Sequence, residues 1–207
     1  MNPSIEAMAE QLLEQSAGRR RYMVALAGPP GAGKSFRSAW LARALNGCCE
    51  GVAEVVPMDG YHFDNAVLEP RGLLPIKGAP ETFDVDGLLH DLARLRPADR
   101  DVAIPVFDRP LDLARAGGKV IRPSHRILII EGNYLLLDEA PWSSLRDYFD
   151  FTLFLEVEDD VLEQRLIQRW LAMGQDQAGA ISRTCDKDML NAELIKRDSI
   201  AADLHWQ

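Results

Sequence analysis

Short apolar runs alternate with stretches of helical periodicity along the chain. Four runs predict buried strands: 22–27, 53–58, 126–131 and 151–157. Apolar residues recur at the spacing of a helix face in five other segments: 4–17, 35–45, 84–95, 160–173 and 187–203. Strands that alternate with helices predict an α/β fold in which helices cover both faces of a parallel sheet.

Three further segments complete the predicted architecture. The apolar run 102–107 contains Pro105, which cannot donate a ladder hydrogen bond, so we expect an edge strand or a short extension there. The polar stretch 174–186 joins the last two helices, and a loop rich in Gly and Pro spans 64–81. No internal repeat or low-complexity linker interrupts the pattern. We therefore expect a mostly parallel five-stranded sheet in a single domain, residues 1–207.

The charge balance argues against a nucleic-acid-binding module. The chain has 23 Lys and Arg against 32 Asp and Glu, a formal net charge of -9, and such a field repels polyanions. Arg19, Arg20 and Arg21 could form a local basic patch, but three charges at a helix end are also what a solvated cap presents.

Cysteine usage and the apolar runs indicate where the protein resides. Cys48, Cys49 and Cys185 have neither a disulfide framework nor zinc spacing, which fits a reducing cytoplasm. The apolar runs are far shorter than the roughly 20 residues that cross a bilayer, and Glu6 and Glu10 stand where an export signal would be apolar. We expect a cytoplasmic protein without a membrane partner.

A glycine-rich loop between the first strand and the next helix carries the clearest chemistry. Residues 28–35 read GPPGAGKS, a full match to G-x-x-x-x-G-K-[ST] in the strand–loop–helix context that the motif requires. The glycines let backbone amides approach phosphate oxygens, Lys34 supplies a charge to the β and γ phosphates, and Ser35 supplies an oxygen to Mg²⁺. The alternative is a glycine-rich turn with a solvated lysine. We expect ATP or GTP to contact this loop through Gly28, Pro29, Pro30, Gly31, Ala32, Gly33, Lys34, Ser35 and Phe36.

Acidic residues follow two of the other predicted strands. Parallel sheets bind ligands at the carboxyl ends of their strands, so Asp59 after the second strand could accept a proton from an attacking hydroxyl. The alternative for Asp59 is a simple turn with Gly60. Glu131 follows four apolar strand residues, the Walker-B arrangement with Glu in place of Asp, and is expected near Mg²⁺.

Two arginines one helical turn apart could close over a transferring phosphate. Arg165 and Arg169 share a face of the helix 160–173. Surface salt bridges with Asp159, Asp160 or Glu163 are the alternative role. No N-K-x-D guanine motif is present, which disfavours a GTPase switch.

Together these segments resemble the P-loop kinase family that contains uridine kinase, phosphoribulokinase and bacterial pantothenate kinase. The resemblance spans about residues 21–195 and rests on GPPGAGKS (28–35), MDGYHF (58–63), KGAPETFD (77–84), PVFDR (105–109), EGNYLLLD (131–138) and RLIQR (165–169). It implies the three-layer α/β/α fold of P-loop NTPases with a helical lid at about 160–186. It also implies a kinase that uses ATP and Mg²⁺ to phosphorylate a hydroxyl of a small molecule.

The resemblance assigns roles to individual residues. Asp59 becomes the catalytic base, Lys34, Arg165 and Arg169 act on the transferring phosphate, and Ser35 and Glu131 hold the metal. The acceptor is expected to contact Asp59, Tyr61, His62, Phe83, Asp84, Phe107, Asp108 and Arg109.

The acceptor itself stays open at this point. The motif spellings look most like a compact bacterial subgroup described as nucleoside kinase-like or as fructokinase, and both a ketose and a nucleoside offer a primary alcohol. The short chain between Phe107 and Val120 leaves little room for the substrate-binding hairpin of uridine kinase, which favours a free sugar such as fructose over a nucleoside. A pantothenate-like acceptor is a further alternative. Two other classes remain, an ATP-dependent regulatory switch and a nucleotide-binding protein without catalysis. A homodimer is compatible with the sequence.

Overall fold

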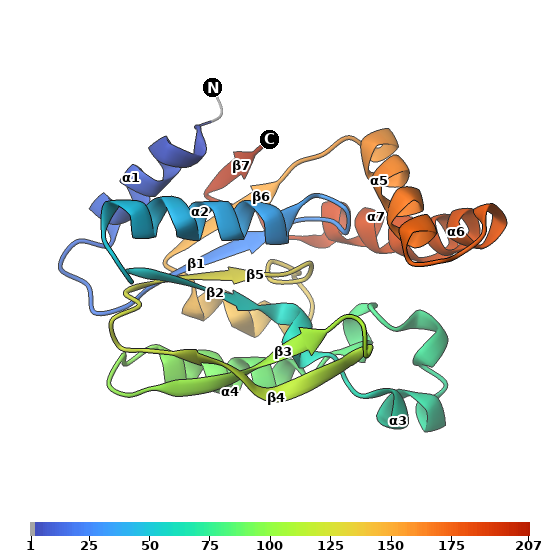
Figure 1. Ribbon diagram of the computed structural model, residues 1–207, viewed down its shortest axis with the longest axis horizontal. Coiled ribbons are helices and arrows are strands. Elements are labelled where there is room, and N and C mark those ends of the chain that lie inside the picture. The colour runs from blue at the N-terminus through green and yellow to red at the C-terminus, as the bar shows by residue number, and fades with distance from the viewer. Residues whose placement is uncertain (1–2) are drawn as a thin grey trace.

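A five-stranded, wholly parallel sheet lies at the centre of the protein (Figure 1). The computed structural model describes residues 3–207. The strand order is β2-β5-β1-β6-β7, with every neighbouring pair parallel. The strands are β1 (Tyr22–Ala27), β2 (Ala53–Pro57), β5 (Ile127–Glu131), β6 (Phe151–Leu155) and β7 (Leu204–Trp206). The predicted mostly parallel five-stranded sheet is confirmed.

Each face of the sheet packs against its own apolar cluster, as the period of two in a strand requires. Met23 and Ala25 of β1 belong to one cluster, and Val24 and Leu26 belong to the other. Figure 1 shows α1 (Ile5–Gln15) and α2 (Lys34–Cys48) on one side of the sheet and α4 (Val85–Leu95) on the other. This arrangement is the expected three-layer α/β/α architecture.

Side-chain caps fix the starts of two helices. Ser4 accepts a hydrogen bond from the Ala7 amide at 3.2 Å at the start of α1. Asp84 accepts one from the Gly87 amide at 2.9 Å at the start of α4. Such caps satisfy amides that have no partner within the helix, which is why both helices begin one residue after the cap.

The segment 102–107 is an edge strand, as expected, but of a separate sheet and not of the central one. It forms β3 (Val102–Asp108), which pairs antiparallel with β4 (Leu113–Ile121) in a separate two-stranded sheet. Pro105 lies at the register shift between Ile104 and Val106, where the ladder does not need its missing amide hydrogen. The chain between Phe107 and Val120 is therefore itself part of a hairpin, with a short turn at 109–112.

The carboxyl-terminal third of the chain also differs from the prediction in detail. α5 (Asp159–Ala172) is followed by α6 (Gln177–Arg183), a π-helical turn (Thr184–Asp188) and α7 (Met189–Asp198). The predicted polar connector 174–186 is thus mainly helical. α7 ends at Asp198, and Asp203 accepts hydrogen bonds from the amide and hydroxyl of Thr152 at 2.8 and 2.7 Å. These bonds bring the chain into β7, the fifth strand that the sequence pattern did not predict.

Arg21 is buried, so the prediction of a solvated arginine triplet is wrong for this residue. Its side chain is 4% exposed, and its guanidinium donates to the carbonyl of Leu95 at 2.9 Å and to the carbonyls of Arg122 and His125. Burial lowers the pKa of Arg21 to about 10. Arg21 therefore joins three chain segments.

Smaller elements complete the fold. α3 (Asn65–Leu68) and three short 3-10 turns (Glu69–Arg71, Leu74–Ile76 and Pro80–Thr82) fill the predicted loop 64–81, and two further 3-10 helices span Met58–Tyr61 and Trp142–Tyr148. Within residues 3–207, every helix is too short or too polar to span a bilayer.

A substitution at Gly60 tests whether the β3–β4 hairpin lies directly against the segment after β2. A Cβ at this position would meet the Pro105 carbonyl oxygen at 2.5 Å, a clash with backbone. We expect Gly60→Ala to lower the free energy of unfolding by about 1–3 kcal/mol, as overpacking does.

Gly47→Ala is the matched control, because Gly47 lies within α2 and no atom lies within 4 Å of its added Cβ. This variant should gain about 0.5–1 kcal/mol from the lost glycine entropy. Urea unfolding compares the two, and equal effects would contradict the close approach of Gly60 to β3.

Candidate functional site

The phosphate-binding loop leaves β1 and enters α2 through backbone that only glycine adopts readily. Gly28, Gly31 and Gly33 have φ angles of 147°, 80° and 92°. Gly33 is the N-cap of α2 and offers no side-chain cap. The amides of the first helical turn are therefore directed to the loop, where an anion would satisfy them.

Lys34 folds back over this loop. Its ammonium donates to the carbonyls of Gly28 at 2.8 Å and Pro29 at 2.9 Å, and the residue is only 8% exposed. Burial lowers the pKa of Lys34 to about 8, while the nearby carboxylates of Glu131 and Asp59 act in the opposite direction. The loop thus holds a buried cation beside donors suited to phosphate.

Ser35 and Glu131 come together as the strand order requires. The Ser35 hydroxyl donates to Glu131 Oε1 at 3.0 Å, and Glu131 ends β5, whose residues pair in register with β1. Glu131 is 7% exposed, and burial together with the neighbouring Asp59 raises its pKa. A hydroxyl and a carboxylate with few other protein ligands are the oxygen donors that Mg²⁺ prefers, so these two residues fit the metal.

Asp59 lies at the carboxyl end of β2, on the 3-10 turn 58–61. Its carboxylate is half-buried and forms an ion pair with Arg109 at the end of β3. The alternative of a simple turn is also realised in the backbone, because the His62 amide donates to the Asp59 carbonyl at 3.3 Å. The turn presents the carboxylate near Lys34 and Glu131, whose pKa values it affects.

His62 forms part of an aromatic wall beside Asp59. Its Nδ1 lies 2.8 Å from the Asp59 carbonyl oxygen, and its ring lies 4.0 Å from Phe83 and 4.8 Å from Phe107, measured between centroids. Burial lowers the pKa of His62. An imidazole that packs between two rings suits packing against a small acceptor.

Three of the residues proposed to contact the acceptor have partners within the fold. The Tyr61 hydroxyl donates to Asp91 at 2.9 Å within the core, so we leave Tyr61 out of the acceptor site proposed below. Phe83 is buried against Tyr134 and Trp142, and one carboxylate oxygen of Asp84 caps α4.

The end of β3 brings the other expected acceptor residues to the same place. Phe107 lies next to His62, and Arg109 pairs with Asp59. Asp108 pairs instead with Arg115 of β4 at 3.1 Å. Phe107 and Arg109 therefore lie beside Asp59, whereas Asp108 stabilises the hairpin.

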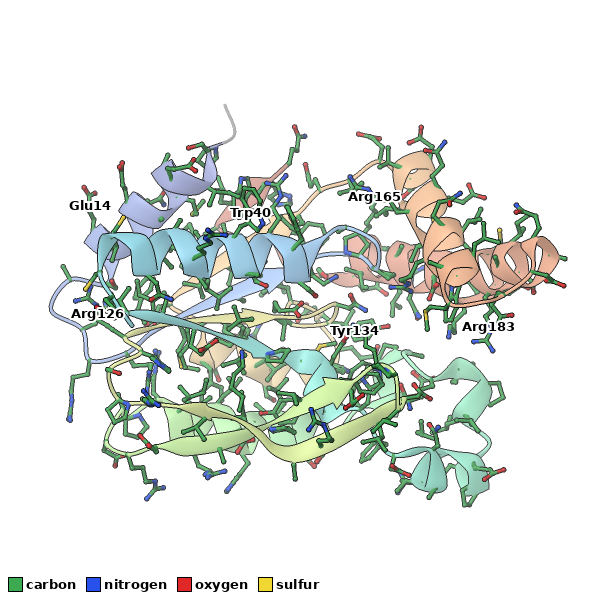
Figure 2. All side chains as sticks on the ribbon, viewed as in Figure 1. Glu14, Trp40, Arg126, Tyr134, Arg165 and Arg183 are labelled. Atoms are coloured by element: carbon green, nitrogen blue, oxygen red, sulfur yellow. The ribbon has the colours of Figure 1, made fainter. Side chains whose placement is uncertain are left out.

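The two lid arginines do not form the surface salt bridges considered as their alternative. Arg165 of α5 donates to the Gly31 carbonyl at 3.3 Å, which places it on the phosphate loop (Figure 2). Arg169 pairs with Asp188 at 3.3 Å, and the Trp170 indole donates to the same carboxylate at 2.7 Å. Both arginines lie close to the phosphate loop, since Arg169 also lowers the pKa of Lys34.

Sequence reasoning missed the residues that join the segment 64–82 to the β3–β4 hairpin and to the segment after β5. Lys77 donates to Asn65 Oδ1 at 2.6 Å and pairs with Asp112 at 3.1 Å, and its ammonium lies 5.3 Å from the Phe107 ring centre. The Tyr134 hydroxyl donates to the Gly78 carbonyl at 2.6 Å. Their positions within KGAPETFD and EGNYLLLD were the available signal.

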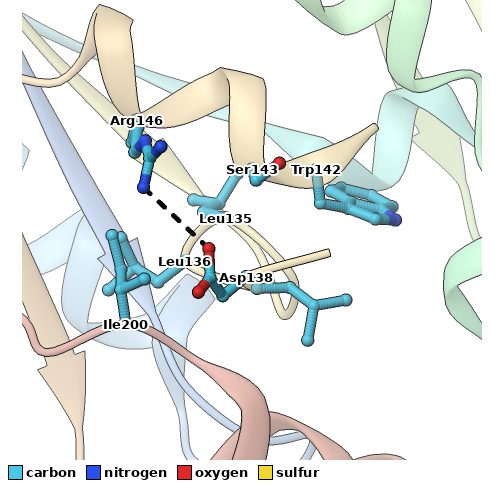
Figure 3. A pocket seen from close by; sticks show the side chains of 8 residues that line it. Leu135, Leu136, Asp138, Trp142, Ser143, Arg146 and Ile200 are labelled. Carbon is cyan, nitrogen blue, oxygen red and sulfur yellow. Dashed lines mark ion pairs between the residues drawn. The ribbon is translucent and has the colours of Figure 1, made fainter. Parts of the chain in front are cut away.

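One pocket lies away from these residues. It is bounded by the segment after β5, the 3-10 helix 142–148 and Ile200, and Arg146 faces Asp138 across it at 3.9 Å (Figure 3). None of its lining residues belongs to the phosphate loop or neighbours Asp59. The chemistry described above is therefore separate from this pocket.

Comparisons with known proteins agree with this geometry. No family model matches the chain. A Schizosaccharomyces pombe protein named "Putative uridine kinase" is 33% identical over 213 residues, covering 99% of this chain and 90% of its own length. The Escherichia coli protein YggC, named as uncharacterized, is 34% identical over 211 residues, covering 98% of this chain and 87% of its own.

The chain belongs to the uridine kinase-like family of P-loop kinases. It is thus a kinase, a phosphotransferase with an alcohol group as acceptor. The crystal structure of a "putative fructose transport system kinase" from Silicibacter sp. superimposes with a TM-score of 0.93 at 45% identity, covering 99% of this chain and 100% of that one. The resemblance inferred from the motifs is confirmed.

The buried Lys34 makes stability depend on pH in a defined direction. Its pKa is about 8 in the folded protein against an ordinary value of 10.5. Between these values the unfolded chain binds more protons, so stability rises with pH. We expect ligand-free Lys34→Met to be more stable than the natural protein at pH 7 by on the order of 1–3 kcal/mol.

This advantage should shrink as the pH rises from 8 towards 10.5. Urea unfolding of both proteins at pH 7 and pH 9.5 measures it, and referring each value to the natural protein cancels other titrations. An advantage that is equal at both pH values would contradict the buried ammonium.

Proposed function

We propose that the protein transfers the γ-phosphate of ATP to a hydroxyl of a small sugar, such as fructose. The observation that carries this proposal is the contact of Ser35 with Glu131 at 3.0 Å beside the phosphate loop, with the Asp59 carboxylate close enough to act on both Glu131 and Lys34. Phosphate-binding donors, a metal-binding pair and a candidate base thus meet at one edge of the sheet. Phosphoryl transfer requires this combination.

Each group has a distinct role in the proposed reaction. The loop amides and Lys34 bind the β and γ phosphates, and Ser35 and Glu131 hold Mg²⁺, which neutralises phosphate charge when bound. Arg165, which contacts the Gly31 carbonyl, and Arg169 would bind the transferring phosphoryl group. Positioning and charge stabilisation supply most of the catalysis.

Asp59 orients the acceptor and takes its proton. The hydroxyl oxygen forms a bond to the γ-phosphorus while the bond from that phosphorus to the β–γ bridging oxygen breaks, and ADP leaves. The hydroxyl proton passes to the Asp59 carboxylate. The ion pair with Arg109 holds this carboxylate in place.

Two observations support a sugar. The β3–β4 hairpin turns at 109–112, which keeps the segment beside Asp59 short. The 45% identical Silicibacter protein is named for fructose transport. The S. pombe relative is named for uridine, so a nucleoside is the second candidate.

An acceptor panel tests the proposed function. ADP release with Mg²⁺ and ATP is measured with sugars, ribonucleosides, pantothenate and glycerate, each against a blank without acceptor. Stimulation by a sugar is expected. If only a nucleoside stimulates ADP release, the nucleoside replaces the sugar as the proposed acceptor. Fast ADP release without any acceptor would favour the regulatory switch.

Asp59→Asn tests the base. Loss of general base catalysis should lower kcat by about 10²–10⁴-fold, whereas Kd for ATP should stay nearly constant because the phosphate loop is unchanged. Asp138→Asn is the control, since Asp138 pairs only weakly, with Arg146, outside the site. Turnover of Asp59→Asn equal to that of the control would remove Asp59 from this role.

A further inference from the structure

Lys187 is a cation whose neighbouring carboxylate, Asp188, already pairs with Arg169. The π-helical turn between α6 and α7 presents its half-buried side chain, and the ammonium donates to the carbonyl of Lys77 at 3.2 Å. Among the ion pairs of residues 3–207, Lys187 has none. π-helical turns cost backbone hydrogen bonding and occur frequently at functional sites.

Lys187 and two further cations lie around the indole ring of Trp170. The ammonium of Lys187 lies 5.2 Å from the Trp170 ring centre, and the guanidinium carbons of Arg183 and Arg169 lie 4.9 and 5.5 Å from it. Asp188 pairs with Arg169 alone. Arg183 lies on the side of α6 nearest the segment 64–82 (Figure 2). Lys187 and Arg183 therefore have no ion-pair partner within residues 3–207, and their mutual repulsion favours a bound anion.

The charged surroundings of Lys187 differ from those of Lys34 in the phosphate loop. The charged groups that act on Lys34 are Glu131, Asp59, Arg169 and Arg109, whereas those that act on Lys187 are Asp188, Arg183, Arg169 and Asp112. Only Arg169 is common to both sets. Arg169 thus acts on both ammonium groups, whereas Lys187 otherwise faces charged groups that differ from those at the phosphate loop.

The surroundings of Lys187 belong to the acceptor side. Lys187 donates to the backbone carbonyl of Lys77, and the side-chain ammonium of Lys77 lies over the ring of Phe107. Phe107 in turn contacts His62, next to Asp59. The Lys77 ammonium pairs with Asp112, whereas Lys187 has no ion-pair partner among the described residues. An ammonium offers three donors, of which the Lys77 carbonyl uses one.

We propose that the acceptor is a sugar that carries an acid group, a carboxylate or a phosphate, and that Lys187 binds this group. The inference rests on the proposed function and narrows it from sugars in general to their acidic derivatives. The acid group lies against Lys187 and Arg183, while the hydroxyl to be phosphorylated lies at Asp59. Carboxylate and phosphate share the chemistry that an ammonium recognises.

Neutral sugars and their acidic derivatives test whether the site requires an acid group on the acceptor. ADP release is compared for fructose, its 1- and 6-phosphates, and glucose beside gluconate and glucuronate. We expect kcat/KM to be higher for a sugar phosphate or a sugar acid than for its neutral parent. Whichever derivative has the higher kcat/KM identifies the acid group that the site binds. A neutral sugar used as well as its acidic derivatives would overturn the inference and leave the kinase standing. Failure of every sugar would remove the proposed function as well.

Substitution of Lys187 tests the residue. With the best acidic acceptor, Lys187→Met should raise the acceptor KM by about 10- to 100-fold, the loss expected for one charged hydrogen bond, and should leave the ATP KM nearly constant. Lys187→Arg should restore much of the loss, because the charge returns. The neutral parent sugar should respond little to either variant.

Lys119→Met is the matched control. Lys119 also donates to a backbone carbonyl, that of Val55 at 3.0 Å, but it lies on β4 beside Glu54. Thermal unfolding confirms that the variants are folded. Equal KM changes for acidic and neutral acceptors, or no change in Lys187→Met, would contradict the proposed contact.

Discussion

The parallel pairing of β1 with β5 determines where the chemistry of this protein can occur. Leu26 pairs with Glu131, so the loop that leaves β1 runs past the carboxylate that ends β5. This register allows Ser35, at the start of α2, to reach Glu131 across 96 residues of sequence. A shift of one residue would turn Glu131 to the opposite face of the sheet.

The site concentrates charges that the fold only partly compensates. Lys34 is held by two carbonyls, and Glu131 is buried next to Asp59. Burial lowers the pKa of Lys34 and raises that of Glu131. Keeping these groups buried costs stability in the absence of ligand. Such a cost in stability is expected at a catalytic site, because the charged groups are already placed for the charges of the transition state.

The sequence predicted the parts of the fold that repeat a clear pattern. The strand 22–27, the helix after the phosphate loop and the helix that begins near Asp84 all follow from local signals. The β3–β4 hairpin did not, because its second strand contains Gly117 and Gly118 and lacks regular alternation. Strand β7 has only three residues, and its existence depends on pairing with β6 rather than on its own composition.

The site divides in the same way. The phosphate loop, Glu131 and the Asp59 turn were predictable, since each combines a motif with a strand end. Tyr61 shows the limit of motif reasoning: its position in MDGYHF suggested an acceptor contact, yet its hydroxyl bonds to Asp91 in the core. Lys187 was not predictable, because its importance comes from a π-helical turn and from Lys77, 110 residues away.

The central claim is that the γ-phosphate goes to a hydroxyl and not to water. ³¹P NMR of the protein with ATP, Mg²⁺ and the sugar that best stimulates ADP release follows both fates in one sample. We predict a phosphomonoester resonance that grows in step with ADP, with little inorganic phosphate. Inorganic phosphate growing in step with ADP, with the sugar unchanged, would contradict the account.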